Sequence, residues 1–325
     1  MKKTVWIMVI ALAVALATTT CGGDDDNGGG GGGDGTPGLL FTLINSGSNA
    51  DTYSVRKGTV TSGAVTIPAT YNGKAVTEIG NKGDNGVNGA FYNTSITSIT
   101  IPASVNTIGA FAFYKCESLT GIPIPANVTH IDRQAFRECT SLASITIPAS
   151  LMSLEGSYMF EGCTSLTSVT ISVNPTGIYA GMFSGCASLT SVNIPASVKS
   201  IGTEAFDGCE SLTSITLPAG VTSIGDAAFR KCTSLTSITI PAGVTSIGDS
   251  AFGGCTSITS ITIPDSVTTV GNFAFANWTS VQTINVPWQS GSKPNGWGYV
   301  PTGGNVNDFA WDKGCNAQIV YLDSE

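Results

Sequence analysis

Apolar residues recur along most of the chain in a unit of about 23 positions. The clearest copy begins at Ala228 and reads AFRKCTSLTSITIPAGVTSIGDS. Self-similarity at a fixed period of this length is typical of solenoids, in which each repeat forms one turn of a coil. The phenylalanine of the unit occurs nine times, at successive spacings of 22, 23, 24 and then five times 23 residues: Phe91, Phe113, Phe136, Phe160, Phe183, Phe206, Phe229, Phe252 and Phe275.

The pattern inside one unit predicts its local structure. Residues 235–240 alternate apolar, mostly β-branched residues with small polar ones and end at Pro241, which predicts a short strand. Val244 and Ile247 lie three positions apart and precede a glycine, so we expect a tight turn and then about one helical or 3₁₀ turn on the opposite side of the coil. Stacked units bury their apolar faces together and place equivalent strands side by side in a parallel sheet. The predicted fold class is an α/β repeat solenoid about 40 Å long, with nine strands about 4.8 Å apart.

The sequence changes at both ends of the periodic region, where the exposed coils need covers. Residues 39–89 are expected to form an N-terminal cap, with a β-hairpin over residues 39–64 and a partial repeat after it. Residues 90–287 hold the nine full repeats. Residues 288–325 break the period and predict an aromatic C-terminal cap that ends in a strand and contains Trp288, Trp297, Trp311 and Cys315.

Three departures from the repeat predict local irregularity between residues 120 and 180. Pro123 stands inside an expected strand, where it removes one hydrogen bond from the sheet. Ser172 stands where the other units have proline, and residues 150–158 carry one extra position.

The first residues carry the features of an export signal. Two lysines precede an uncharged, mostly apolar stretch at residues 5–17, and three threonines and Cys21 follow it. The stretch is shorter than the roughly 20 apolar residues that a membrane-spanning helix needs, so a transmembrane anchor is the less favoured alternative. We therefore predict a signal peptide over residues 1–21.

Cys21 is the candidate lipidation site, because its position resembles that of the modified cysteine of bacterial lipoproteins. Thr18 and Thr20 depart from the leucine and small residue that those proteins favour. The alternative is ordinary secretion with Cys21 as a free thiol. The glycine-rich and aspartate-rich residues 22–38 predict a flexible tether with a reach of about 23 Å. Together these features predict an exported protein held by lipid at the outer membrane or cell surface, or otherwise a secreted or periplasmic one.

Charge and composition narrow the classes of function. Lys and Arg number 14 against 22 Asp and Glu, a formal net charge of -8, so no basic stripe is available for nucleic acid. The only histidine is His130, which rules out a multi-histidine metal site. Acidic pairs such as Glu204 and Asp207 lie on the expected solvated surface without a basic or nucleophilic partner. We expect no enzyme, cofactor or metal, and membrane contact only through the N-terminal lipid.

Seven cysteines occupy one repeat position, and their spacing of 23 or 24 residues is unlike the paired ligands of a metal site. Stacked side chains would point the same way along a row, which favours small buried apolar groups over disulfides, although a few bridges stay possible in an oxidising compartment. The row comprises Cys116, Cys139, Cys163, Cys186, Cys209, Cys232 and Cys255.

The outward positions of the predicted strands are almost all serine or threonine. If Ile238 and Ile240 point inward, Ser237 and Thr239 point outward. Such residues are simple polar strand formers, and they are equally able to form a binding surface. Their uniformity favours weak, repeated contact over a single tight epitope. The candidate ligand-facing residues are Ser144, Thr146, Ser168, Thr170, Ser191, Asn193, Ser214, Thr216, Ser237, Thr239, Ser260 and Thr262.

The motif Leu-x-x-Ile-x-Ile-Pro, followed by Val-x-x-Ile-Gly and Ala-Phe-x-x-Cys, resembles the leucine-rich repeat of the BspA type, found in bacterial surface proteins and in Treponema. The resemblance covers about residues 65–287 and recurs nine times. It implies a leucine-rich repeat solenoid and a cell-surface adhesin that binds a host extracellular matrix protein or another cell-surface protein through the sheet face. A passive coat lipoprotein without a specific ligand, and a hydroxyl-rich solenoid that binds ice or glycan, remain alternatives.

Overall fold

The computed structural model describes residues 35–45, 47–80, 89–152, 156–287, 315 and 317–321. The predicted signal peptide, Cys21, most of the predicted tether, and Trp288, Trp297 and Trp311 of the predicted C-terminal cap lie outside the described residues. Residues 36–38, which we assigned to the tether, are bonded to the fold: Thr36 N donates to Thr66 O at 2.8 Å. The described part of the chain contains no helix long and apolar enough to cross a membrane.

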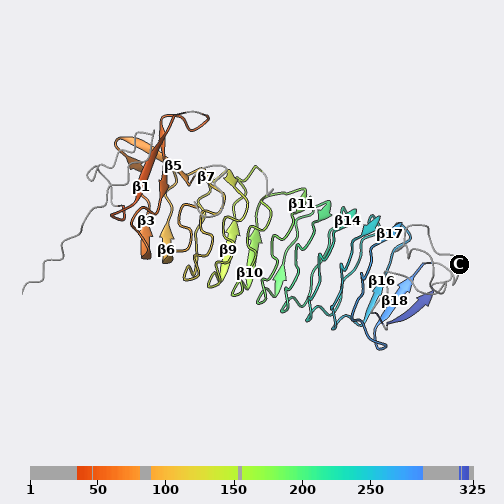
Figure 1. Cartoon of the computed structure of the whole chain (residues 1–325). Helices are drawn as coiled ribbons and strands as arrows, with labels where there is room; N and C mark the ends of the chain where they lie inside the picture. The colour runs from red at the N-terminus through yellow and green to blue at the C-terminus, as the bar shows by residue number, and fades with distance from the viewer. Residues whose placement is uncertain are drawn as a thin grey trace, which may run out of the picture.

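A β-hairpin covers the N-terminal end of the solenoid, as predicted (Figure 1). Strand β1 (Leu40–Ile44) pairs antiparallel with β2 (Thr52–Arg56), and β2 pairs parallel with β5 (Lys74–Ile79), which also carries β4 (Thr70–Tyr71). Phe41 stacks on Tyr71 at 4.2 Å between ring centroids, and Tyr53 meets Tyr71 edge-on at 5.0 Å. These rings fix the hairpin to the first coil.

Most coils contribute a short strand or bridge to each of two columns, which run along opposite edges of the rod in Figure 1. The first column is the predicted one, and its strands are β3 (Ser62–Thr66), β6 (Ser95–Thr100), β9 (Ser144–Ile147), β10 (Ser168–Ile171), β12 (Ser191–Val192), β16 (Ser260–Thr262), β18 (Thr283–Val286) and β19 (Gln318–Tyr321). The second column was not predicted, and after β5 it holds β7 (Thr107–Ile108), β8 (His130–Ile131), β11 (Gly177–Ile178), β13 (Ser200–Ile201), β14 (Ser223–Ile224), β15 (Ser246–Ile247) and β17 (Thr269–Val270).

Neighbouring strands of each column pair in parallel, and equivalent residues face one another. Ser168 lies opposite Ser144 and Ser191 in the first column, and Ser223 lies opposite Ser200 and Ser246 in the second. The expected irregularity is present. The described residues around Pro123 form no strand, so β6 and β9 belong to separate sheets.

The helical or 3₁₀ turns that we expected are absent from the described residues. The turn that holds Phe229 has positive φ at Ala227 (51°) and Lys231 (58°), a conformation that interrupts a right-handed helix. Its backbone N–H groups also bond outside the turn. Phe229 N donates to Ala251 O at 2.8 Å, and Lys231 N donates to Gly253 O at 2.8 Å. Hydrogen bonds to the next coil therefore replace those of a helix, while the predicted leucine-rich solenoid with a parallel sheet is confirmed.

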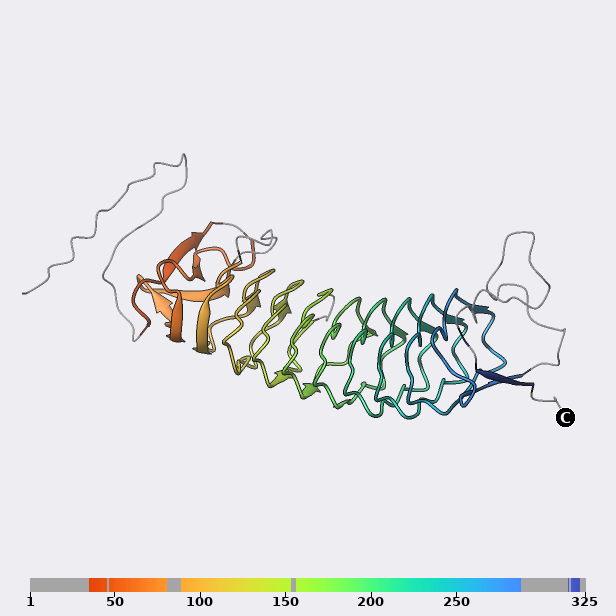
Figure 2. The ribbon, with the colours of Figure 1, turned by 60° about the horizontal axis from the view of Figure 1, so that its bottom comes forward.

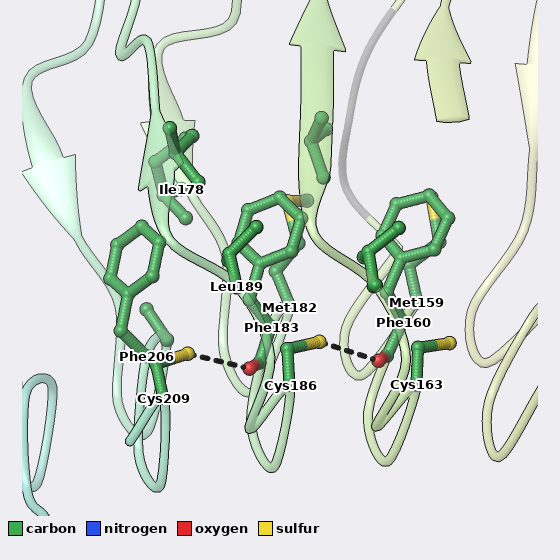
Figure 3. Packing of buried hydrophobic residues seen from close by; sticks show 14 of the residues in the cluster. Met159, Phe160, Cys163, Ile178, Met182, Phe183, Cys186, Leu189, Phe206 and Cys209 are labelled. Atoms are coloured by element: carbon green, nitrogen blue, oxygen red, sulfur yellow. Dashed lines mark hydrogen bonds between the residues drawn. The ribbon is translucent and has the colours of Figure 1, made fainter. Parts of the chain in front are cut away.

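The core of the stacked coils seen in Figure 2 is a row of phenylalanine rings that runs through all nine repeats, and Figure 3 shows three of them, Phe160, Phe183 and Phe206. All nine side chains are fully buried, and neighbouring rings lie nearly parallel with centroids 5.4–5.8 Å apart. Trp278 meets Phe275 edge-on at 5.1 Å, after which the described chain has no further ring in the stack. Because each ring contacts the rings before and after it, this row joins every coil to its neighbours.

We expect Phe183→Ala to lower the free energy of unfolding by about 3–5 kcal/mol, since it removes a ring that lies between two others and leaves a cavity. Urea unfolding followed by circular dichroism measures this change. Ser191→Ala, at an exposed position of the next strand, should stay within about 0.5 kcal/mol of the parent protein. Equal effects of the two substitutions on the free energy of unfolding would contradict a stabilising role of the phenylalanine row.

Candidate interaction surfaces

The structure places all twelve candidate ligand-facing residues on the outer side of the first column, and all twelve are exposed. In β10, Ser168 and Thr170 point to solvent, whereas Val169 and Ile171 are buried. Strand pairing aligns Ser144 with Ser168, and Thr146 with Thr170. The predicted alternation is therefore confirmed, and hydroxyl groups of successive coils lie next to one another. We call these twelve residues the hydroxyl face.

A threonine stands directly before every pair except Ser144/Thr146 and has a different role, which the sequence did not reveal. The hydroxyl of Thr167 donates to the carbonyl of Ala143 at 3.1 Å, and Thr190 donates to Thr167 O at 3.3 Å. Thr213 and Thr236 continue this ladder. These hydroxyls hold coils together. Their recurring position in most copies, immediately after the repeat leucine or its equivalent, was the signal that could have revealed it.

The hydroxyl face itself keeps almost all of its hydrogen-bonding capacity. Within the described residues, Thr262 is its one member with a side-chain hydrogen bond, accepted from Asn285 Nδ2 at 3.4 Å. The other side chains of the face can therefore donate to and accept from a ligand. None of the twelve carries a charge, so the face offers hydrogen bonds without electrostatic steering.

The acidic residues Glu204 and Asp207 have partners, which corrects our expectation that they lack a basic one. Arg230 binds Asp207 through two hydrogen bonds of 3.0 and 2.6 Å. Glu204 accepts a hydrogen bond from the Tyr158 hydroxyl at 3.3 Å. Both carboxylates are thus engaged in contacts between coils, and neither is presented to a ligand as a free acid or base.

The turn edge of the first repeats carries aromatic and cationic side chains in contact. Lys115 Nζ and the Arg137 guanidinium each lie 5.5 Å from the centre of the Tyr114 ring, and Tyr92 packs against Tyr114 at 5.4 Å. Glu138 lies within 3.7 Å of Lys115 and 3.5 Å of Arg137. The opposite charges offset each other, so this edge presents no surface patch with a single sign of charge. Its side chains instead join neighbouring coils.

The seven repeated cysteines are buried free thiols, and each donates to a phenylalanine carbonyl of the preceding coil. Cys186 Sγ lies 3.2 Å from Phe160 O, and Cys209 Sγ lies 3.1 Å from Phe183 O (Figure 3). At the end of the row Trp278 Nε1 donates to Phe252 O at 2.9 Å. The interpretation as small buried groups is supported, and the described residues hold no cluster that could bind a metal.

Burial raises the pKa of these thiols above their ordinary value of 9.0. The pKa reaches about 11 for Cys116 and about 12 for Cys163 and Cys255, because the interior disfavours the thiolate. The thiols of this row are therefore protonated at physiological pH and poorly reactive.

Stacked coils with a strand on two edges and a shared apolar row define a solenoid of leucine-rich repeats. Comparison with protein families identifies the kind of repeat. The chain belongs to the family described as BspA type leucine rich repeat region, whose model matches residues 87–212 and 200–292. The resemblance drawn from the repeat motif is thus confirmed.

Solved structures of bacterial leucine-rich repeat proteins are similar to this chain. A protein from Bacteroides ovatus is 28% identical with a TM-score of 0.70, over 88% of this chain and 70% of that chain. The T. pallidum leucine-rich repeat protein is 28% identical with a TM-score of 0.45, over 69% and 90% of the two chains. A leucine rich cell surface protein from Faecalibacterium prausnitzii is 25% identical with a TM-score of 0.44, over 91% and 96%. No curated protein matches the chain.

We expect the free energy of unfolding to fall as pH rises from 9 toward 12. Thiols of the unfolded chain ionise near pH 9, while Cys163 in the folded protein keeps its proton until about pH 12. The folded state then binds more protons than the unfolded state, so rising pH favours unfolding. Urea unfolding at a series of pH values up to about pH 11 measures the slope.

Cys163→Ala provides the control for this slope, because it removes one buried thiol and keeps the tyrosine and lysine titrations. Its stability should decline less steeply with pH than that of the parent protein. Identical slopes would show that the buried thiols do not contribute to the alkaline loss of stability.

Proposed function

We propose that this protein is an exported interaction module that binds a partner protein through the hydroxyl face. The observation that carries the proposal is the in-register array of exposed serine and threonine side chains, whose hydroxyls, with the exception of Thr262, form no hydrogen bond within the described structure. Stacked repeats give such an array a fixed spacing, and solenoids commonly use extended surfaces of this kind for binding. The role is binding without catalysis.

The chemistry of the hydroxyl face favours an extended, polar partner. Neutral hydrogen bonds at an exposed surface each contribute little, about 0.5–1.5 kcal/mol. Equivalent groups on successive coils let a long ligand form several of them at once, which raises the overall affinity. A matrix-type host protein with repeated polar segments fits this arrangement, and the protein would act as an adhesin. A glycan chain is the second ligand class that such hydroxyls can bind.

The N-terminal sequence supports display at a surface. A signal peptide over residues 1–21, a lipid on Cys21 and a glycine-rich tether would hold the solenoid away from an outer membrane or cell surface. A passive coat lipoprotein shares this architecture and differs in having no specific ligand.

The double variant Thr146→Val/Thr170→Val tests the hydroxyl face. Valine keeps the branched shape and strand preference of threonine and removes two neighbouring hydroxyls. We expect binding to immobilised matrix proteins, such as collagen and laminin, to weaken by about tenfold, as judged by surface plasmon resonance.

Thr269→Val is the matched control, since Thr269 is an exposed strand residue of the second column. It should leave binding unchanged. Saturable binding that both variants retain would place the contact elsewhere on the solenoid. Absence of saturable binding by the parent protein to matrix, cells or glycans would favour the passive coat.

Cys21→Ala tests the anchor. In the native bacterium, the parent protein should incorporate a labelled fatty acid and be cleaved by protease added to intact cells, whereas Cys21→Ala should remain unlabelled and leave the membrane fraction. Equal labelling of both proteins would exclude Cys21 as the acylated residue. A labelled protein that is protected from protease would indicate that the solenoid faces the periplasm.

A further inference from the structure

A polar hollow of about 910 Å³ lies where the hairpin meets the second column. The loop between β1 and β2 forms one wall, and strands β5, β7 and β8 contribute Glu78, Thr107 and His130. The hairpin stands over this end of the solenoid in Figure 1, and its loop contacts the next coil through Asn49. The hollow is distinct from the hydroxyl face, which belongs to the first column.

The repeat sequence changes at this hollow. Strand pairing aligns Glu78 with Thr107 and Thr107 with His130, so these side chains occupy one position of three successive coils. In later described coils the same position holds only small residues: Gly177, Ser200, Ser223, Ser246 and Thr269. The only histidine of the chain and a carboxylate thus replace serine or glycine where the hairpin loop overhangs the column.

Hydrogen bonds hold the overhanging loop in place. Asn49 and Asn106 exchange two bonds between their side-chain amides, of 3.0 and 2.9 Å, and Asn49 Nδ2 also donates to Glu78 Oε1 at 2.8 Å. These contacts join the hairpin to two coils. The walls of the hollow are therefore fixed before any ligand arrives, which lowers the entropy lost on binding.

Several polar atoms on the walls of the hollow are able to form further hydrogen bonds. The Thr129 hydroxyl lies 3.3 Å from Asn106 O and 2.9 Å from His130 Nδ1, so Nδ1 of the imidazole is engaged within the fold. His130 Nε2 is left to bond a ligand hydroxyl, as acceptor or donor according to the tautomer. Within the described residues, His130 Nε2, Glu78 Oε2 and the Ser48 hydroxyl have no protein partner.

The lining selects for a neutral ligand with many hydroxyl groups. Glu78 and His130 are the only ionisable side chains among the described lining residues, and lysine and arginine are absent from that lining, so an anion finds no counter-charge. A side-chain amide both donates to and accepts from hydroxyls, a neutral imidazole donates at one ring nitrogen and accepts at the other, and an ionised carboxylate accepts. Ile44, on the same face of β1 as Thr42, supplies an apolar contact for the C–H face of a ring.

We propose that this hollow is a binding site for a neutral sugar, either a free monosaccharide or the terminal unit of a glycan. A second hollow of about 420 Å³ on the same column serves as a contrast. No overhanging loop contributes to its lining. Its carboxylates, Asp226 and Asp249, accept hydrogen bonds from the backbone N–H groups of Asp249 and Asn272, at 2.8 and 2.6 Å. This site does not depend on the protein-binding role of the hydroxyl face.

Because the chain has one histidine, the imidazole of His130 provides a specific probe of the site. Untagged protein is titrated with glucose, galactose, mannose, fucose and N-acetylglucosamine, while the Cε1–H signal of His130 is followed by NMR. We expect at least one of these neutral sugars to shift the signal saturably, and glucuronate not to do so. Glu78→Gln should weaken binding by about tenfold or more, because it replaces a charged acceptor by a neutral one.

Ser223→Ala, on the open part of the same column, should leave the affinity unchanged. If Glu78→Gln disturbs folding, Ser48→Ala provides a second variant, which we also expect to weaken sugar binding. The proposal is overturned if none of the five sugars shifts the His130 signal, if glucuronate alone shifts it, or if a folded Glu78→Gln or Ser48→Ala variant binds as tightly as the parent. A free sugar that binds, combined with no binding of matrix proteins, would overturn the hydroxyl-face proposal and leave this one intact.

Discussion

Stacking of nearly parallel phenylalanine rings between successive coils is the contact that sets the geometry of the molecule. Ring centroids 5.4–5.8 Å apart are compatible with parallel strands at the edges of the coil, so one translation satisfies both the apolar row and the backbone ladders. No unit can bury its ring alone, and stability therefore arises between neighbours. This explains why a hairpin at one end, and Trp278 where the ring row stops, differ from the repeat that they adjoin.

The same translation also decides which polar side chains are structural. Cys186 and Thr167 each donate to a carbonyl of the preceding coil, so a thiol and a hydroxyl act as links between coils. Ser168 and Thr170, one and three positions after Thr167, face solvent, and their hydroxyls form no hydrogen bond within the described structure. Residue type alone does not separate the two groups. Their position within the coil does, which is why a serine-rich and threonine-rich composition carries both cohesion and a binding surface.

The sequence allowed the period, the first column, the buried cysteines and the N-terminal hairpin to be predicted, because each depends on spacing or alternation. It did not reveal the second column, because its strands are only two residues long in most coils. Strand β15, for example, contains only Ser246 and Ile247, and the spacing of Val244 and Ile247 three positions apart suggested a turn. The expected helical turn was wrong because Ala227 and Lys231 adopt positive φ without being glycine, a conformation imposed by bonds to the next coil. The sugar-site residues escaped notice because Asn49 and Asn106 meet only through the fold.

Translational repetition limits what a solenoid can recognise. Equivalent coils present equivalent groups, so the hydroxyl face can offer many similar weak contacts and little that distinguishes one register of a ligand from the next. A site with its own shape requires a break in the repetition. The hairpin provides such a break, since its loop closes over Glu78 and His130 at positions that are otherwise serine, threonine or glycine. Specific recognition of a small ligand is therefore expected at the capped end, and extended, multivalent contact along the rod.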